Sequence, residues 1–113
     1  MKRGTVVLTK FPFTDLKSSK RRPAIVVSKS ESVRKDVIVA FISSVIPEKL
    51  SSTDFLFDTT NKDFKKSNLK KTSVIKLDKL VTLNKSIFTG ELGFVLKKTL
   101  KEIDKRLKIA LDL

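Results

Sequence analysis

Short apolar segments separated by polar stretches run through most of the chain. Apolar runs of about 4–8 residues, bounded by turn-forming residues, are typical of β-strands. Two of these runs are apolar at nearly every position, which indicates strands that are covered on both faces. The pattern predicts strands at 4–10, 23–28, 37–42, 55–57, 73–77 with 80–83 as one long bent strand, and 87–92. Between them we expect a polar connection at 30–35, a loop at 47–52, and a turn with an irregular helical piece at 61–71.

The hydrophobic period changes near the C-terminus and predicts one amphipathic helix. Apolar residues recur there at spacings of four, three, four and four, at Leu96, Leu100, Ile103, Leu107 and Leu111. No Ser, Thr, Asp or Asn caps the start, and Lys97 and Lys98 lie at the positive end of the helix dipole. We therefore expect docking on the sheet, rather than local signals, to hold this helix.

This order of elements predicts a mainly β fold with helices (α+β). Several short strands followed by one packed helix are typical of a small curled sheet or SH3-like barrel. The 113 residues are enough for one core and too few for two, so we expect a single domain over residues 1–113. Two strands with both faces apolar are hard to cover in an isolated small barrel. We therefore also expect a homodimer.

The charge of the chain favours a polyanionic partner. Lys and Arg number 25 against 12 acidic residues, which gives a formal net charge of +13. Residues 1–35 hold ten of the basic residues and only two acidic ones. A Lys-rich composition accounts for part of the total, but it does not explain this clustering. Such a field attracts nucleic acid, anionic lipid or an acidic protein segment.

Several residue types are absent, and their absence narrows the chemistry. The chain has no Cys, so disulfides and thiolate metal sites are excluded, and it has no His, Tyr or Trp either. Catalysis would have to use Arg, Lys, Ser, Thr, Asp or Glu, and we expect no metal and no cofactor. No apolar run approaches the roughly 20 residues of a membrane span, and 5–8 is too short for a signal-peptide core. The expected location is the cytoplasm.

A loop that is both basic and aromatic precedes the second predicted strand. Positive side chains on a loop can contact phosphates, and exposed aromatic rings can stack on bases. The candidate RNA-binding residues in this loop are Phe11, Phe13, Lys17, Lys20 and Arg21. A loop that folds back to bury its two Phe rings is an equal alternative, and plain solvation of the basic groups is another.

The order and spacing of these segments resemble the MazF/PemK family of toxin endoribonucleases over the whole chain. An Arg-Pro pair opens an apolar strand, and a later apolar strand ends in Ile-Ser where the family normally has Ile-Thr or Ile-Ser. Thr5 stands where the first strand of the family usually has Asp or Glu. The segments that carry the resemblance are 2–8, 20–28, 36–44, 76–83 and the final helix through Leu111.

This resemblance implies the toxin of a type II toxin–antitoxin system that cleaves single-stranded RNA selectively and without a metal. It further implies a homodimer that an acidic antitoxin neutralises. The family's catalytic Arg falls on Arg22 and its catalytic Thr on Ser43. If their two strands pair antiparallel, both residues reach the same rim of the barrel and Asp36 goes to the opposite end. Ser44 is a second candidate RNA-contacting hydroxyl, although strand alternation points it to the other face.

Two other functions remain open at the level of the sequence. One is a gyrase-directed toxin of the CcdB type, which shares the fold and uses a Trp-containing contact at the end of its last helix. This chain has no Trp. The other is a non-catalytic barrel that binds RNA or DNA, because its charge and fold would be the same.

Overall fold

The computed structural model describes residues 1–10, 21–30 and 33–113. Every predicted strand is present, and the helical piece and the terminal helix lie where the pattern put them. The elements are β1 (Thr5–Thr9), β2 (Arg22–Val26), β3 (Asp36–Ser43), β4 (Asp54–Phe57), α1 (Phe64–Ser67), β5 (Ser73–Asn84), the 3₁₀ turn η1 (Lys85–Ile87), β6 (Gly90–Phe94) and α2 (Lys97–Leu111).

Most strand boundaries differ from the predicted ones by one or two residues, and the start of the last strand differs most. The last strand begins at Gly90 and not at residue 87, because the chain first makes the turn η1. The side chain of Asn84 accepts a hydrogen bond from the backbone N–H of Ser86 and starts this turn. Asn favours such local side-chain to backbone bonds, which compete with strand pairing.

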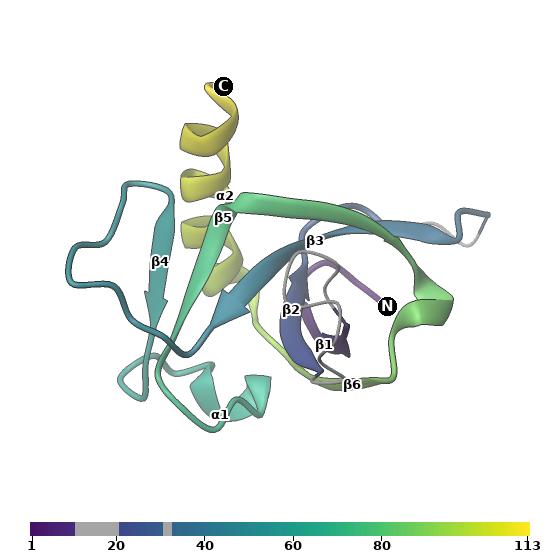
Figure 1. Cartoon of the computed structure of the whole chain (residues 1–113), viewed down its shortest axis with the longest axis horizontal. Helices are drawn as coiled ribbons and strands as arrows, with labels where there is room; N and C mark the ends of the chain where they lie inside the picture. The colour runs from purple at the N-terminus through teal and green to yellow at the C-terminus, as the bar shows by residue number, and fades with distance from the viewer. Residues whose placement is uncertain (11–20, 31–32) are drawn as a thin grey trace.

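The strands form one antiparallel sheet that curls on itself. Its order is β4-β5-β3-β2-β1-β6, and the long strand β5 pairs with both β3 and β4. The second half of β5, η1 and β6 carry the chain around to β1, so that the sheet curls into a small half-barrel with β4 and β6 at its edges (Figure 1). The predicted α+β fold with a small barrel and a C-terminal helix is confirmed.

The curl buries both faces of β1, β2 and β3 within one chain. One core cluster faces α2 and includes Val6, Ile25 and Ile103. A second cluster lies inside the curl and includes Val7 and Val39. The apolar strands are thus covered without a second copy. The apolar strands therefore no longer support a homodimer, and the homodimer stays a prediction.

The start of α2 is capped by a residue from a distant segment. The carboxylate of Asp63 accepts hydrogen bonds from the backbone N–H of Leu96, at 2.7 Å, and from the hydroxyl of Thr99, at 2.8 Å. Asp63 precedes Leu96 by 33 positions, so no capping motif is visible near the helix. A carboxylate at this end also interacts favourably with the helix dipole.

We expect Asp63→Ala to lower the free energy of unfolding by about 1–3 kcal/mol, because it removes this cap and leaves the partly buried backbone N–H of Leu96 without its acceptor. Urea unfolding followed by circular dichroism measures the effect. Asp78→Ala is the matched control, since Asp78 is exposed on β5. Equal stability of the two variants would show that Asp63 does not hold the helix.

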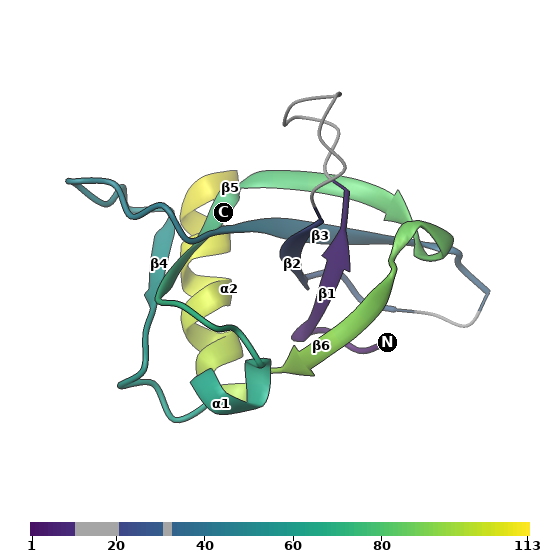
Figure 2. The ribbon, with the colours of Figure 1, turned by 60° about the horizontal axis from the view of Figure 1, so that its bottom comes forward.

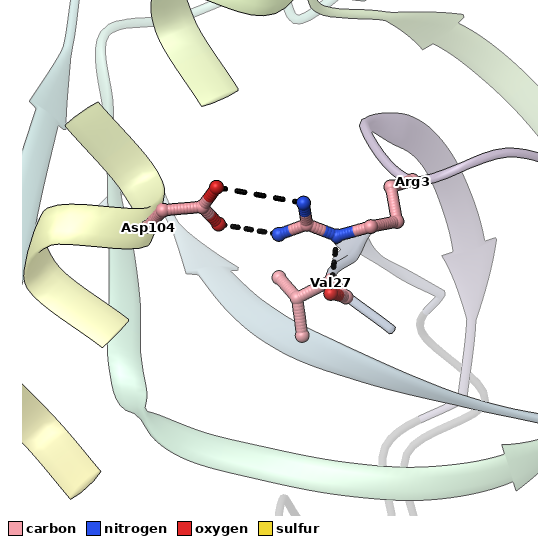
Figure 3. A network of polar contacts seen from close by, with 3 residues as sticks. All are labelled: Arg3, Val27 and Asp104. Carbon is pink, nitrogen blue, oxygen red and sulfur yellow. Dashed lines mark hydrogen bonds and ion pairs between the residues drawn. The ribbon is translucent and has the colours of Figure 1, made fainter. Parts of the chain in front are cut away.

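Arg3 ties the N-terminus to α2 and to the end of β2 (Figure 3). Both terminal nitrogens of its guanidinium donate to the carboxylate of Asp104, and its Nε donates to the carbonyl oxygen of Val27 at 2.7 Å. Arg3, one of the ten basic residues in 1–35, therefore stabilises the fold. It does not contribute an unpaired charge to a polyanion surface.

Candidate active site

The pairing of β2 with β3 determines which residues meet at the barrel mouth. The two strands are antiparallel, with Ala24 opposite Phe41. Continuing this register by two residues toward the start of β2 sets Arg22 across from Ser43. Asp36 lies at the other end of β3, where it pairs with β5. The antiparallel pairing expected from the sequence is thus confirmed. The meeting of Arg22 and Ser43 at one rim follows from extending this register, and their catalytic roles stay predictions.

Arg22 and Ser43 also share one face of the sheet. Residues two apart along a strand point to the same side. Ala24 and Phe41, two positions further in, belong to or pack against the cluster inside the curl. Both candidate residues therefore lie at the rim of the barrel interior, where side chains are partly exposed. Thr9 of β1 pairs with Arg22 from the other side and is buried.

The guanidinium of Arg22 is partly buried and makes no hydrogen bond or ion pair with any residue of 1–10, 21–30 and 33–113. Arg3 and Arg106 differ, because Arg3 binds Asp104 and Val27 while Arg106 donates to the carbonyl oxygen of Ser52 at 3.1 Å. The fork of donors on Arg22 is therefore open to a ligand. A guanidinium matches the geometry of a phosphate with two parallel hydrogen bonds.

The hydroxyl of Ser43 is held by the backbone that follows it. Its Oγ accepts a hydrogen bond from the backbone N–H of Val45 at 3.1 Å. A hydroxyl that accepts in this way still has its own proton to donate. The contact therefore orients Ser43 even though it lacks the methyl group of Thr. Ser44 lies just beyond β3 and is exposed.

Most of the predicted RNA-contacting loop lies outside the described residues. This applies to Phe11, Phe13, Lys17 and Lys20, whose roles stay predictions. Arg21 is described, is exposed and directly precedes β2. The described ends of this loop, at the end of β1 and the start of β2, lie at the same rim as Arg22 (Figure 2).

Lys76 is a candidate residue that the sequence did not single out. It pairs with Phe41 in β3, and Val74, two positions earlier in β5, pairs with Ser43. Lys76 thus lies on the same face as Ser43, as a diagonal neighbour about 7–8 Å away by strand geometry. It is partly exposed and has no partner in the described part of the chain. The available signal was a single Lys inside the apolar run 73–77.

Three further features of the described structure are its acidic residues, the length of its helices and a hollow away from this rim. Among residues 1–10, 21–30 and 33–113 no three acidic side chains come together in a way that could hold a metal ion. No helix in this same part of the chain is long and apolar enough to cross a membrane. A hollow of about 720 Å³ lies at the far end of β1, between the N-terminus, β6 and the start of α2, and contains none of the candidate residues.

Several solved structures share this fold. An endoribonuclease in complex with its cognate antitoxin from a mycobacterial species is 21% identical, with a TM-score of 0.77 over 100% of this chain and 96% of the other. The Mycobacterium tuberculosis toxin MazF-mt6 is 17% identical, with a TM-score of 0.75 over 96% and 97%. MazF in a MazE–MazF complex from Deinococcus radiodurans is also 17% identical, with a TM-score of 0.74 over 100% and 96%.

The family is shown by the sequence itself. No curated protein matches this chain. A family model does match, over residues 2–111, and it describes the PemK-like, MazF-like toxins of type II toxin–antitoxin systems. This agrees with the resemblance carried by the Arg-Pro strand, the Ile-Ser strand end and the final helix. The chain therefore belongs to the family of PemK-like, MazF-like toxins of type II toxin–antitoxin systems.

Proposed function

We propose that this protein is a toxin that cleaves single-stranded RNA without a metal ion. The observation that carries the proposal is the unpaired guanidinium of Arg22 beside Ser43 at the barrel mouth. Membership of the toxin family supports it. So does the similarity to a mycobacterial endoribonuclease, which in its solved structure is bound to a cognate antitoxin.

The two side chains suit cleavage by the RNA's own 2′-hydroxyl. In that reaction the 2′-hydroxyl gives up its proton to solvent as its oxygen attacks the phosphorus, the bond from phosphorus to the 5′-oxygen breaks, and the leaving oxygen takes up a proton from solvent. Negative charge grows on the other phosphate oxygens, where Arg22 donates two hydrogen bonds and Ser43 one. Arginine titrates above about 12, so we assign Arg22 to stabilising this charge before any proton transfer.

The same rim would also receive an acidic antitoxin. The net charge of +13 and the unpaired cations Arg22 and Lys76 favour a negatively charged segment as well as RNA. An antitoxin that covers them would block the substrate site directly.

We further propose a cytoplasmic homodimer, and sedimentation at tens of micromolar protein would test the dimer.

We expect the purified protein to cut a long RNA equally well with and without EDTA. The products should carry a 2′,3′-cyclic phosphate and a 5′-hydroxyl, because the 2′-oxygen and not water is the nucleophile. End-group analysis of the fragments measures this. A gyrase-directed toxin or a mere binder would leave the RNA intact, and loss of cleavage in EDTA would contradict the proposed mechanism.

Ser43→Ala should slow cleavage by roughly ten- to a hundredfold, since one hydrogen bond to a charged group contributes about 1.5–3 kcal/mol. Ser43→Thr should preserve or raise the rate, because it keeps the hydroxyl and restricts its rotamer. Ser44→Ala is the matched control and should change little. Single-turnover rates compare the three variants. The opposite ranking of the two Ala variants would identify Ser44 as the working hydroxyl.

A further inference from the structure

A lysine-rich stretch far from the candidate active site forms part of a second groove. Residues 61–71 carry five Lys against one Asp, and the structure folds them into α1 and its flanks. Here they lie next to the start of α2. A hollow of about 610 Å³ separates the two segments, with Lys62 and Lys66 on one side and Lys98 on the other. We call this hollow the lysine groove.

The three lysines of the groove are exposed, and none has an ion-pair or hydrogen-bond partner within the described ranges. The polar residues Thr60 and Asn61 also line the groove, as does the partly exposed ring of Phe55. Cationic groups combined with an aromatic ring are the features with which proteins hold single-stranded nucleic acid.

Two acidic residues, Asp63 and Glu102, line the groove together with the lysines, and they leave its positive field in place. Asp63 is buried and is compensated by the start of α2 and the hydroxyl of Thr99. The carboxylate of Glu102 forms an ion pair with the ammonium of Lys105 in the same helix, at 3.8 Å. Asp58 does not line the groove but accepts hydrogen bonds from the hydroxyl and the backbone N–H of Thr60, which does, and these bonds lower the pKa of Asp58. These carboxylates are outnumbered by the lysines of 61–71 and of the first turn of α2.

The groove lies on the other side of the molecule from Arg22. Thr9, at one end of β1, pairs with Arg22, whereas Thr5, at its other end, pairs with Phe94 shortly before α2 begins. Figure 2 shows α1 and the start of α2 at the bottom and the start of β2 above them. The longest extent of the molecule is 33 Å. A strand of about thirty nucleotides, at about 3.4 Å each, is long enough to reach both places.

We propose that the lysine groove binds the phosphate backbone of an RNA strand that continues beyond the nucleotides held at the candidate active site. This rests on the proposed function, which makes single-stranded RNA the substrate. The three unpaired lysines favour a phosphate backbone over an apolar peptide.

The test compares two double variants that make the same charge change. Lys62→Glu with Lys98→Glu alters the groove, and Lys101→Glu with Lys108→Glu alters exposed lysines of α2 that do not line it. Both carry Arg22→Ala so that the RNA stays intact. Labelled oligouridines of about six and about thirty nucleotides are the probes. Fluorescence anisotropy at several salt concentrations gives their affinities.

We expect the groove variant to bind the longer RNA about tenfold or more weakly than the control variant, with a salt slope lower by about 1.4 for two lost lysines. The short RNA should bind both variants alike. Equal losses in the two variants, or an equal loss on the short RNA, would overturn the proposal. Circular dichroism checks folding, and Lys62→Gln with Lys98→Gln offers a milder version of the same change.

The outcomes separate this proposal from the proposed function. If the native chain cleaves RNA while the groove variant binds the long probe as the control does, the groove is not an RNA site and the function stands. If the native chain cleaves no RNA but the groove variant still binds the longer RNA more weakly than the control variant, the proposed cleavage is wrong and the groove is still an RNA-binding site. Loss of poly-glutamate binding with unchanged RNA binding would assign the groove to an acidic protein and overturn the proposal.

Discussion

Arg22→Ala should lower the rate of RNA cleavage by about 10²–10³-fold and leave the fold intact. Removing one preorganised donor to the charge that develops in a transition state costs about 2.7–4 kcal/mol. The guanidinium is partly exposed at the barrel mouth and binds no other described residue, so folding does not depend on it. Single-turnover cleavage of a long RNA measures the rate, and thermal unfolding checks the fold.

Two further variants sharpen this result. Arg22→Lys should rescue little activity, because an ammonium is a point charge and cannot reproduce the two parallel hydrogen bonds of a guanidinium. Arg21→Ala removes the same charge from the exposed neighbouring position and should mainly weaken RNA binding. An Arg22→Ala protein that still cleaves at the parent rate would show that the candidate active site is wrongly placed.

The meeting of Arg22 and Ser43 could be predicted from the sequence because it depends on short-range information. Each strand is visible as a local apolar run, and neighbouring strands in the chain pair antiparallel through a single connection. Once the register is known, the position of Ser43 follows from that of Arg22 by counting. The terminal helix could be predicted for the same reason, because its apolar residues recur every three or four positions along one continuous segment.

The contacts that could not be predicted join segments that lie far apart in the chain. Asp63 caps a helix that begins more than thirty positions later, and Arg3 reaches Asp104 across almost the whole sequence. Lys76 comes to the site only because β5 pairs with β3 after a register shift between Ala40 and Phe41. None of these pairings has a local signal, because each depends on how the completed sheet curls.

The curl of the sheet also explains why the apolar strands do not by themselves require a dimer. A flat sheet with two apolar faces needs a partner on each side. Here α2 covers one face, while the bend of β5 and the return through β6 cover the other with the chain's own residues. The bend was predicted from the two apolar segments 73–77 and 80–83, and a small curled sheet or barrel from the order of the elements, but not that the curl covers both faces of the apolar strands.

Gly93→Ala should destabilise the protein strongly, by about 1–3 kcal/mol or more, whereas Gly90→Ala in the same strand should have little effect. A Cβ at Gly93 would lie 2.0 Å from the carbonyl oxygen of Lys66 and 2.7 Å from the carbonyl carbon of Ser67, both backbone atoms of α1. A Cβ at Gly90 would meet nothing within 4 Å.

The clash cannot be relieved by a side-chain rotation, so α1 as a whole would have to move away from β6. Two contacts oppose that movement: Phe64 of α1 is buried in the core, and the side-chain amide of Asn68 donates to the carbonyl oxygen of Leu92. Thermal unfolding by circular dichroism should show the Gly93→Ala midpoint lowered by roughly 5–15 °C relative to Gly90→Ala. Equal midpoints would mean that α1 can shift without cost, and that its packing on β6 does not stabilise the fold.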